Sequence, residues 1–549
     1  MELTPKLAKT ILAGLKTIRS LFEATWQEII DYCLPQRAPV IGTPVPGEKR
    51  GRKIYDSEPG RAMMKLAANL NALLTDPNTQ WFGLITDDEE ANKQPDVIEW
   101  LEKTEKRMKK ALDQSNFGTA VHEFYIDLAG INTAVMYIEE SKTPGKDLAF
   151  STRHIREVYF AENAEGVVDA IYREILMEAR KIIQRWGKDE KANIPAAATK
   201  AFDAGETEKL FPILHVIEPR LERDDGKADI LNMPYKSMWI DVDGDKIVKE
   251  SGYPEFPFAI GRWSKSSGED YGRGPGFEAL ADIKSLNSMA KTMLRTGQKV
   301  ADPPLNVPDT MEGTADLTPG GINFFDARTP EAKVAPIKIG ADLPITRDMI
   351  NDKKNSIRES FYVTQMQLID VNDMTAEEVR QRTAENMRVL GPTFGRLQPE
   401  FLETTVLRCY GILFRAGKIP EPPKLIKEKN LKIKYISPLA KAQLMHEVQA
   451  ITYTAETLLL WYEKTQNQNH LDLLDWDAAA RKIADLDGTP LELLVDQKKV
   501  MDIRKKRKDL MMKQLKLEMA KTQAAGLKDV AGAGLSAAKS ESMGGGPNV

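Results

Sequence analysis

The chain has 549 residues, of which 42% are hydrophobic and 29% charged, and its formal net charge is -4 at pH 7. This length is several times that of a single domain, so we expect a folded chain of several parts. The composition excludes the disordered, collagen-like and disulfide-rich classes. The slightly acidic balance argues against a protein that grips nucleic acid tightly, because such affinity depends on Lys and Arg side chains that neutralise phosphates.

Neither a membrane segment nor a cysteine-based site is predicted. No stretch approaches the ~18 to 20 consecutive apolar residues of a membrane-spanning helix, and the mean hydropathy is -0.40. The first residues are amphipathic and lack the small-residue cleavage site of a signal peptide, so we expect a soluble protein made inside the cell. Cys33 and Cys409 are far apart in the sequence, which predicts two buried structural thiols and no disulfide or zinc site.

The N-terminal part of the chain is predicted to be helical. Residues 3–34 carry apolar side chains at spacings of three and four, which places them on one face of a long amphipathic helix that ends near Pro35. This predicted face consists of Leu7, Ile11, Leu15, Ile18, Phe22, Trp26 and Ile29. A basic, turn-rich loop follows, and helices are predicted to resume over residues 60–75 and 96–116.

Residues 131–263 have the pattern of strands and hairpins. Short runs of β-branched and aromatic residues alternate there with Gly, Asp and Asn turns, with one helix predicted over 177–187. The run of acidic residues at 241–245 resembles the start of a calcium loop, but Gly244 precedes Asp245 where the loop would need the reverse order. A hairpin turn is the favoured interpretation. The predicted fold class is therefore α+β, mainly helical.

Two helices are predicted on either side of a compact insertion. The pattern is helical over 276–300, rich in Pro, Gly and short strands over 301–340, and helical again over 341–362. A loop rich in Gln and Asn over 363–374 precedes a long helix, which a capping box of Thr375 and Glu378 opens. We expect that helix to reach about residue 416 with a kink at Gly391 and Pro392. A short strand near 431–436, helices from about 440 to 515 and a flexible Ala- and Gly-rich tail follow.

No motif in the sequence indicates catalysis. No phosphate-binding GxxxxGK[ST] loop occurs, and the cluster of Gly272, Gly274 and Gly276 lacks dinucleotide-binding spacing, so a turn that opens a helix explains it better. The five histidines show no metal-binding pairing, and no nucleophile motif is present. We therefore predict no catalytic residue, no metal and no cofactor.

Four segments, found in this order along the chain, together resemble the portal, or head-to-tail connecting, family of short-tailed bacteriophages. The most specific is GEDYGRGPGFEALADIKSLNSMAKTML at 268–294, and the second is MTAEEVRQRTAENMRVLGPTFGRLQPEFLETTVLRCYGIL at 374–413. Supporting matches lie at 56–84 and 475–508, so the resemblance spans residues 1 to about 520. The dipeptide Glu58-Pro59 departs from the family's pattern, in which small polar residues or Gly are expected there.

The resemblance implies a portal fold assembled as a ring, and it implies a role for each region. The implied regions are an N-terminal wing at 1–275, a first stem helix at 276–300, a clip at 301–340, a second stem helix at 341–362, a tunnel loop at 363–374, a long wing helix with a return strand at 375–436, a helical crown at 437–503, and a C-terminal helix or barrel with its tail at 504–549.

The implied function is that of a non-enzymatic portal at one capsid vertex of the virion. A ring of about twelve copies, assembled in the host cytoplasm, would conduct double-stranded DNA during packaging and ejection without sequence specificity. The implied partners are the terminase large subunit, a tail adaptor protein, the major capsid and scaffolding proteins, and internal core proteins at the crown. A capsid or scaffold structural protein is the alternative that the residues leave open, whereas a packaging ATPase or nuclease and a membrane pore find no support.

Basic residues of the two stem helices are candidate phosphate contacts if these helices line the bore. Lys284, Lys291, Arg295 and Lys299 recur at spacings of seven, four and four, which places them on one face of the first helix. The second helix offers Lys353, Lys354 and Arg358, and the tunnel loop offers Gln365, Gln367 and Asn372. An equally weighted alternative is that the basic face meets acidic groups of a neighbouring subunit.

Overall fold

The structure is a computed structural model, and it divides into two compact units, Met1–Gln443 and Leu444–Val549. It describes residues 3–45, 47–88, 90–224, 226–227, 229–306, 335–336, 343–366, 391–426, 431–436, 438–487, 495 and 499–517.

The first unit begins with the predicted long helix, α1 (Pro5–Cys33). Its start is fixed by Pro5 in the first turn and by the Thr4 hydroxyl, which accepts a hydrogen bond from the backbone N–H of Leu7 at 3.3 Å. Phe22, Trp26 and other members of the predicted apolar face are buried. Ile18 was wrongly placed on that face, since it is 42% exposed.

Arg19 is a charged residue of α1 that is buried. Its guanidinium donates to the backbone oxygens of Ile155 at 2.8 Å and Arg156 at 2.7 Å, and it lies over the ring of Tyr159. These acceptors satisfy a cation that burial would otherwise destabilise. Glu23, one turn further along α1, accepts from Arg19 as well, with 2.7 Å between Nη2 and Oε1. The apolar face of α1 is therefore interrupted by a polar anchor with one local partner and further partners that the fold provides.

Three more helices complete the N-terminal part. They are α2 (Glu58–Leu74) and α3 (Pro95–Gln114), both predicted, and α4 (Phe117–Gly130), for which no prediction was made. Helix α4 is apolar on most sides and nine of its 14 residues are buried. An element surrounded by other elements does not show the one-sided periodicity by which a surface helix is recognised.

A five-stranded antiparallel sheet with the order β4-β5-β6-β7-β8 forms the predicted strand-rich region. Its strands are β4 (Val158–Glu162), β5 (Val168–Glu178), β6 (Leu210–Pro219), β7 (Tyr235–Asp241) and β8 (Lys246–Tyr253). The predicted hairpin at the acidic run is confirmed, because Asp241 of β7 pairs with Lys246 of β8. Asp245 in this turn has φ 50°, a conformation that Asp tolerates.

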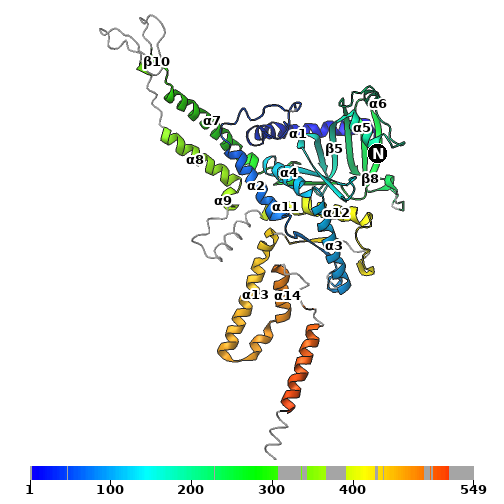
Figure 1. The fold of residues 1–549 in the computed structure, drawn as a ribbon, viewed down its shortest axis with the longest axis vertical. Helices are drawn as coiled ribbons and strands as arrows, with labels where there is room; N and C mark the ends of the chain where they lie inside the picture. Colours follow the sequence, from blue (N-terminus) through cyan, green and yellow to red (C-terminus); the bar gives the residue numbers. More distant parts are fainter. Residues whose placement is uncertain are drawn as a thin grey trace, which may run out of the picture. The chain divides into compact units, whose positions relative to one another are not determined.

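The two faces of this sheet are covered by different helices (Figure 1). Leu214 and Val216 of β6 pack with the N-terminal half of α1. Ile213 points to the other face, where α5 (Ala179–Trp186) and α6 (Ala196–Asp203) bury it with Trp239. Successive side chains of a strand point to opposite faces, so this alternation follows from the sequence of β6. The helix predicted at 177–187 is confirmed as α5.

Two smaller sheets connect distant parts of the first unit. The strands β2 (Thr133–Glu140), β3 (Leu148–Arg153) and β9 (Phe258–Arg262) form an antiparallel sheet with the order β3-β2-β9. In addition, β1 (Phe82–Thr86) pairs with the predicted strand β12 (Leu431–Tyr435), with Leu84 opposite Ile433. The largest apolar core contains side chains from the helices α1, α2, α3 and α4, from the strands β2 and β9, and from helices later in the chain.

The predicted helix, insertion and second helix are present as α7 (Pro275–Ala301), a strand pair, and α8 (Leu343–Ser360). Figure 1 shows α7 and α8 side by side, and the pair of β10 (Leu305–Asn306) and β11 (Ala335–Pro336) lies between them along the chain. The rest of 307–342 lies outside the described residues. A loop was predicted from residue 363, but Val363–Met366 form the short helix α9, so the start of that prediction was wrong.

The later helical segment is described from residue 391 onward. It runs through α11 (Gly391–Leu397), a π-helical turn over Gln398–Glu403, and α12 (Thr404–Arg415). Residues 367–390, which include the predicted capping box and the segment before the predicted kink, lie outside the described part. The predicted apolar positions Phe394, Leu397 and Phe401 are buried.

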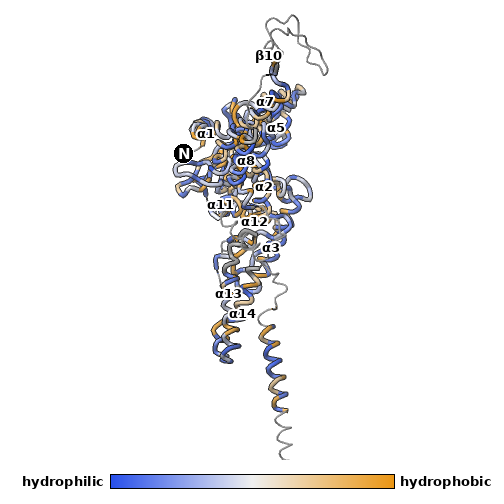
Figure 2. The backbone as a smooth tube through the Cα atoms, turned by 90° about the vertical axis from the view of Figure 1, so that its left-hand side faces the viewer, coloured by the Kyte–Doolittle hydropathy of each residue, from blue (hydrophilic) through white to orange (hydrophobic). Residues whose placement is uncertain are grey.

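The second unit contains helices, as predicted. Most of α13 (Pro438–Thr465), all of α14 (Trp476–Asp487) and a further helix over 499–517 belong to it. The basic block from Arg504 to Lys508 is exposed, and Arg504 pairs with Asp477 of α14, with 2.7 Å between Nη2 and Oδ1. In Figure 2 hydrophilic and hydrophobic residues are mixed along the tube. Among the described residues, no helix combines the length and the hydropathy needed to span a bilayer.

Candidate functional site: the hairpin of helices α7 and α8

The start of α7 is set by the glycine cluster that the sequence analysis assigned to a helix-opening turn. A Cβ atom on Gly272 would lie 2.2 Å from the carbonyl oxygen of Asn132, and one on Gly276 would lie 2.0 Å from that of Gly130. Gly274 is the residue before the helix, against the ring of Trp263. The glycines thus allow α7 to pack directly on the end of α4, which confirms a structural role for them.

Apolar contacts hold α7 and α8 together near this start. Ile283 and Leu286 of α7 are buried, as are Ile350 and Ile357 of α8. Towards the other end of α7 the apolar side chains become accessible, and Leu294 is 56% exposed. The hairpin is therefore anchored in the main core at one end and carries exposed side chains towards the end that leads to β10 and β11.

The two basic residues of the predicted α7 face that lie closest to the start of the helix have partners in their own chain. The ammonium of Lys284 lies 2.9 Å from Oε1 of Glu28 in α1. The Nζ atom of Lys291 lies 5.4 Å from the centre of the Tyr55 ring, which is a cation–π distance. Both contacts tie α7 to the segment that contains α1 and the start of α2.

The three basic residues of α8 are also paired within the chain. Lys353 lies 2.7 Å from Oδ1 of Asp282, a residue of α7. Lys354 and Arg358 lie 2.9 Å and 2.6 Å from the carboxylates of Asp56 and Glu58, respectively. The hydrogen bonds that Asp282 accepts from Lys353 and from the Ser356 hydroxyl keep its pKa below the usual value. Each of these three cations therefore has a carboxylate as its neighbour.

Arg295 and Lys299 differ from the other predicted cations of α7. Both are exposed, and within the described part of the chain neither has an ion pair or hydrogen bond. They follow Lys291 by four and eight residues on the same face of the helix. Two positive charges without a described acidic neighbour remain available on the last turns of α7.

The predicted amide contacts are only partly described. Gln365 lies in α9, and its Oε1 atom is buried without a hydrogen-bond partner in the described ranges. Gln367 and Asn372 lie outside the described residues. The structure therefore brings the seven predicted cations together on α7 and α8.

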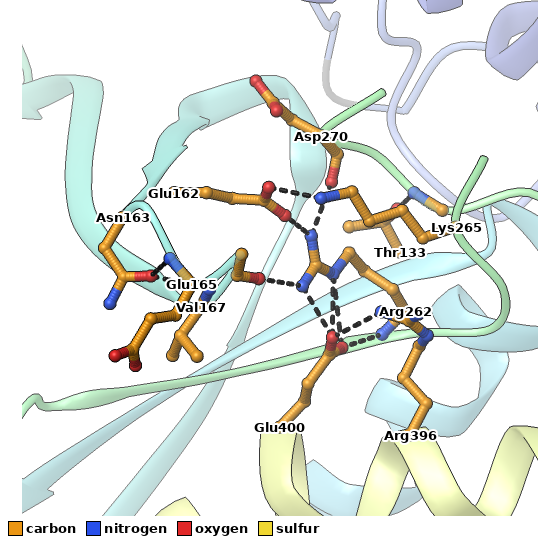
Figure 3. A network of polar contacts seen from close by, with 12 residues as sticks. Thr133, Glu162, Asn163, Glu165, Val167, Arg262, Lys265, Asp270, Arg396 and Glu400 are labelled. Carbon is orange, nitrogen blue, oxygen red and sulfur yellow. Dashed lines mark hydrogen bonds and ion pairs between the residues drawn. The ribbon is translucent and has the colours of Figure 1, made fainter. Parts of the chain in front are cut away.

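A charged network that the sequence analysis missed joins β4, β9 and the π-helical turn (Figure 3). The guanidinium of Arg262 in β9 is 1% exposed and contacts Glu162 of β4 and Glu400 of the π-helical turn. It also donates to the backbone oxygen of Asp270 at 3.0 Å, just before the glycine turn. Lys265 contacts Glu162 as well. Partners 100 and 138 residues apart carry no local sequence signal.

His215 and the two cysteines lie in the core. The ring of His215 stacks on that of Trp239 with 3.7 Å between centroids, and burial lowers its pKa well below the usual value. Cys33 and Cys409 are both buried, as predicted. No group of three or more potential metal ligands occurs in the described ranges.

The described residues form a mixed α+β protein with a helical hairpin anchored in its core. The chain belongs to the family described as bacteriophage head to tail connecting protein, which it matches over residues 5–494.

Two relatives are similar over nearly their whole length. The chain is 28% identical over 509 residues to the portal protein of Salmonella phage epsilon15, covering 90% of each chain. It is 30% identical over 517 residues to the probable portal protein of Bordetella phage BPP-1, covering 92% of this chain and 91% of the relative. The resemblance stated from the sequence is thereby confirmed.

Proposed function

We propose that this protein forms a ring of about twelve copies at one capsid vertex of the virion, assembled in the host cytoplasm. The ring conducts double-stranded DNA during terminase-driven packaging and during ejection, and it has no catalytic role. The observation that carries the proposal is the family match over residues 5–494, supported by relatives whose names are portal protein and probable portal protein.

The regions of the chain receive their roles in the same proposal. Residues 1–275 form a wing, 276–300 and 341–362 the stem helices, and 301–340 a clip, which is supported by the hairpin of α7 and α8 with its β10 and β11 strand pair. Residues 363–374, which begin with helix α9, form the tunnel segment. Residues 375–436 form the long wing helix and return strand, 437–503 the crown, and 504–549 a C-terminal helix or barrel with its tail. The clip meets the terminase large subunit and then a tail adaptor, while scaffolding, capsid and internal core proteins contact other surfaces.

Within the channel we propose two kinds of basic residue. Arg295 and Lys299 act as weak phosphate contacts, because they are exposed and have no acidic neighbour among the described residues. Lys284, Lys353, Lys354 and Arg358 already neutralise carboxylates. DNA would have to compete with these carboxylates, so we assign these four cations a smaller share of the contacts with DNA. The same smaller share is assigned to Lys291, Gln365, Gln367 and Asn372. A conduit needs weak and repeated contacts, since tight phosphate binding would hinder sliding.

Ring formation requires two complementary surfaces on each subunit. Helix α1 supplies one candidate, because Leu21 is 81% exposed and Ile18 is 42% exposed on it. Large apolar side chains exposed on a helix favour contact with another chain. We propose that this side of α1 lies at a subunit interface.

The first experiment is negative-stain imaging of the purified chain with mass determination. A hollow ring of about twelve copies is the expected result. A closed shell, a filament or a stable monomer would contradict the proposal and would favour a capsid or scaffold role.

The channel assignment is tested by DNA packaging with variant rings. The double variant Arg295→Gln/Lys299→Gln should assemble normally but change the amount of DNA packaged or retained. A matched control, Lys65→Gln/Lys110→Gln, removes two exposed cations from α2 and α3. Unchanged packaging by the first variant, or equal changes in both, would argue against the assignment.

A further inference from the structure

A hollow of about 570 Å³ lies beside the five-stranded sheet, on elements that the proposed DNA channel does not use. It is bordered by the end of β3, the short helix η2 (Ile155–Glu157), β5, α5 and β7. Its size lies within the range of about 300–1,000 Å³ that is typical of ligand sites. The basic residues that line it are Lys142, Arg153, Arg173, Lys181 and Arg185.

The lining carries an excess of positive charge. Glu157 is the acidic residue among the lining side chains, and two further carboxylates reach the cations from outside it. Arg185 lies 3.4 Å from Glu139, and Lys181 lies 2.7 Å from Glu178. Five cations therefore face three carboxylates, which leaves a surplus of two positive charges in a concave site. Such a site attracts an anion.

Arg173 is buried and Arg153 is half-buried, and each has an Nε–H group without a hydrogen-bond acceptor among the described residues. The side chain of Arg173 is 7% exposed, and its Nε lies 3.2 Å from Glu157. Nevertheless, no acceptor in the described ranges is aligned for a hydrogen bond with the Nε–H of Arg173 or of Arg153. Burial and the charge of Arg173 lower the pKa of Arg153. An oxyanion supplied from outside would satisfy donors whose burial is otherwise costly.

The hollow also lies at an open strand edge. The last residue of β5 that pairs with β4 is Arg173, opposite Val158. From Glu174 to Glu178, β5 continues with β6 as its partner on one side, and no described strand pairs on the other. Ile175, Leu176 and Met177 all line the hollow. Because successive side chains point to opposite faces, three consecutive lining residues place the hollow along this edge.

These features select among the possible anions. A DNA duplex is a stiff rod, and its phosphates cannot enter a concave site to reach an arginine side chain that is 7% exposed. A free inorganic anion would leave Leu176, which is 57% exposed, uncovered. An extended peptide can add to the strand edge through its backbone and place alternate side chains into pockets. An acidic peptide with apolar residues between its carboxylates matches the positive charge, the exposed apolar side chain and the open strand edge of the site.

We propose that this hollow is a docking site for an acidic, extended segment of a partner polypeptide. The segment pairs with Glu174 to Glu178 of β5 and places a carboxylate against the guanidinium groups of Arg153 and Arg173. Its apolar residues cover Leu176 and Met177. Lys181 and Arg185 of α5 strengthen the binding of the carboxylates at the rim.

Binding is measured by isothermal titration calorimetry on the full chain at low ionic strength. The probe is a six-residue peptide with blocked ends that alternates Glu and Leu. Two comparison peptides carry Gln in place of Glu, or N-methylated backbone amides that cannot pair with a strand. The Glu peptide should bind, and both comparison peptides should bind at least tenfold more weakly.

Matched protein variants assign the binding to the hollow. Lys181→Gln/Arg185→Gln should raise the Kd for the Glu peptide at least tenfold, whereas Arg180→Gln/Lys188→Gln, which removes two exposed cations nearby that do not line the hollow, should change it less than twofold. Circular dichroism confirms that both variants are folded.

Several results would overturn the proposal. They are the absence of binding, equal losses in the two protein variants, or equal binding of the Gln peptide. Undiminished binding of the N-methylated peptide together with displacement by inorganic phosphate would show a simple anion site. Displacement by a DNA duplex at a similar concentration would assign the surface to nucleic acid.

Discussion

Arg262 and Glu400 form an ion pair across 138 residues of sequence, with 2.6 Å between Nη2 and Oε1. The backbone N–H of Arg262 donates to the same carboxylate at 3.1 Å, so side chain and main chain act together. This pair attaches the π-helical turn to β9, and the second carboxylate, Glu162, attaches β4. π-helical turns often mark functional positions in helices, and this one is held by a buried charge.

Replacing Arg262, the central cation of this network, should lower the free energy of unfolding. Arg262→Met would leave Glu162 and Glu400 without their main partner, and the free energy of unfolding should fall by about 3 to 5 kcal/mol. Arg396→Met removes another cation that contacts Glu400, at 3.0 Å, but its side chain is 35% exposed. The expected loss there is below about 1 kcal/mol. Urea unfolding of both variants measures the difference, and similar losses would contradict the ranking.

Two glycines of the same helix should respond in opposite ways to alanine. Gly276→Ala should lower the free energy of unfolding by about 3 kcal/mol or more, because the new Cβ would lie 2.0 Å from the oxygen of Gly130. Apart from the backbone of its own helix, no atom of the described residues lies within 4 Å of a Cβ position on Gly297. Gly297→Ala should stabilise α7 by about 0.5 to 1 kcal/mol. Thermal and urea unfolding provide the test, and a tolerated Gly276→Ala would disprove the close packing of α7 on α4.

Glu105 should make stability depend on pH near neutrality. Burial raises its pKa from 4.5 to about 7, although its carboxylate accepts a hydrogen bond from the Leu84 N–H at 2.6 Å. Because the folded pKa is the higher one, the stabilisation is complete below pH 4.5 and is lost as pH rises through 7. Glu105→Gln lacks this loss and can keep the hydrogen bond. Its stability relative to wild type should therefore increase between pH 4.5 and 8 in urea titrations; a constant difference would refute the shift.

The two thiols should be unreactive in the folded protein. Burial raises the pKa of Cys33 and of Cys409 to about 12, and the thiolate is the reactive form. At pH 8 Ellman's reagent should therefore release little colour from the native chain and two equivalents per chain after denaturation. Rapid labelling of one cysteine without denaturant would show that its surroundings open.

Local patterns were sufficient to predict most of the elements. The apolar spacing and Pro5 define α1, and alternating apolar residues with turn formers define the strands of the five-stranded sheet. Helix α4 was missed because it is buried on most sides and lacks one-sided periodicity. A composition rich in Gln and Asn predicts a loop from residue 363, and the four residues Val363–Met366 are too few to show a helical period. Contacts with α8 and α2 accompany their helical turn.

The sequence by itself determined the family and the order of the elements, because both depend on residues that are close together in the chain. The motif GEDYGRGPG contains the glycines that pack α7 on its neighbours, and the basic residues of α7 repeat with the period of a helix. The tertiary structure alone decided which cations have partners that are distant in the sequence. Lys354 meets Asp56, Arg358 meets Glu58 and Arg262 meets Glu400, and in each case the fold brings together groups separated by more than a hundred residues. Electrostatic interactions act over a few ångströms in space, so only the folded chain shows which charges are neutralised and which remain free to bind a partner.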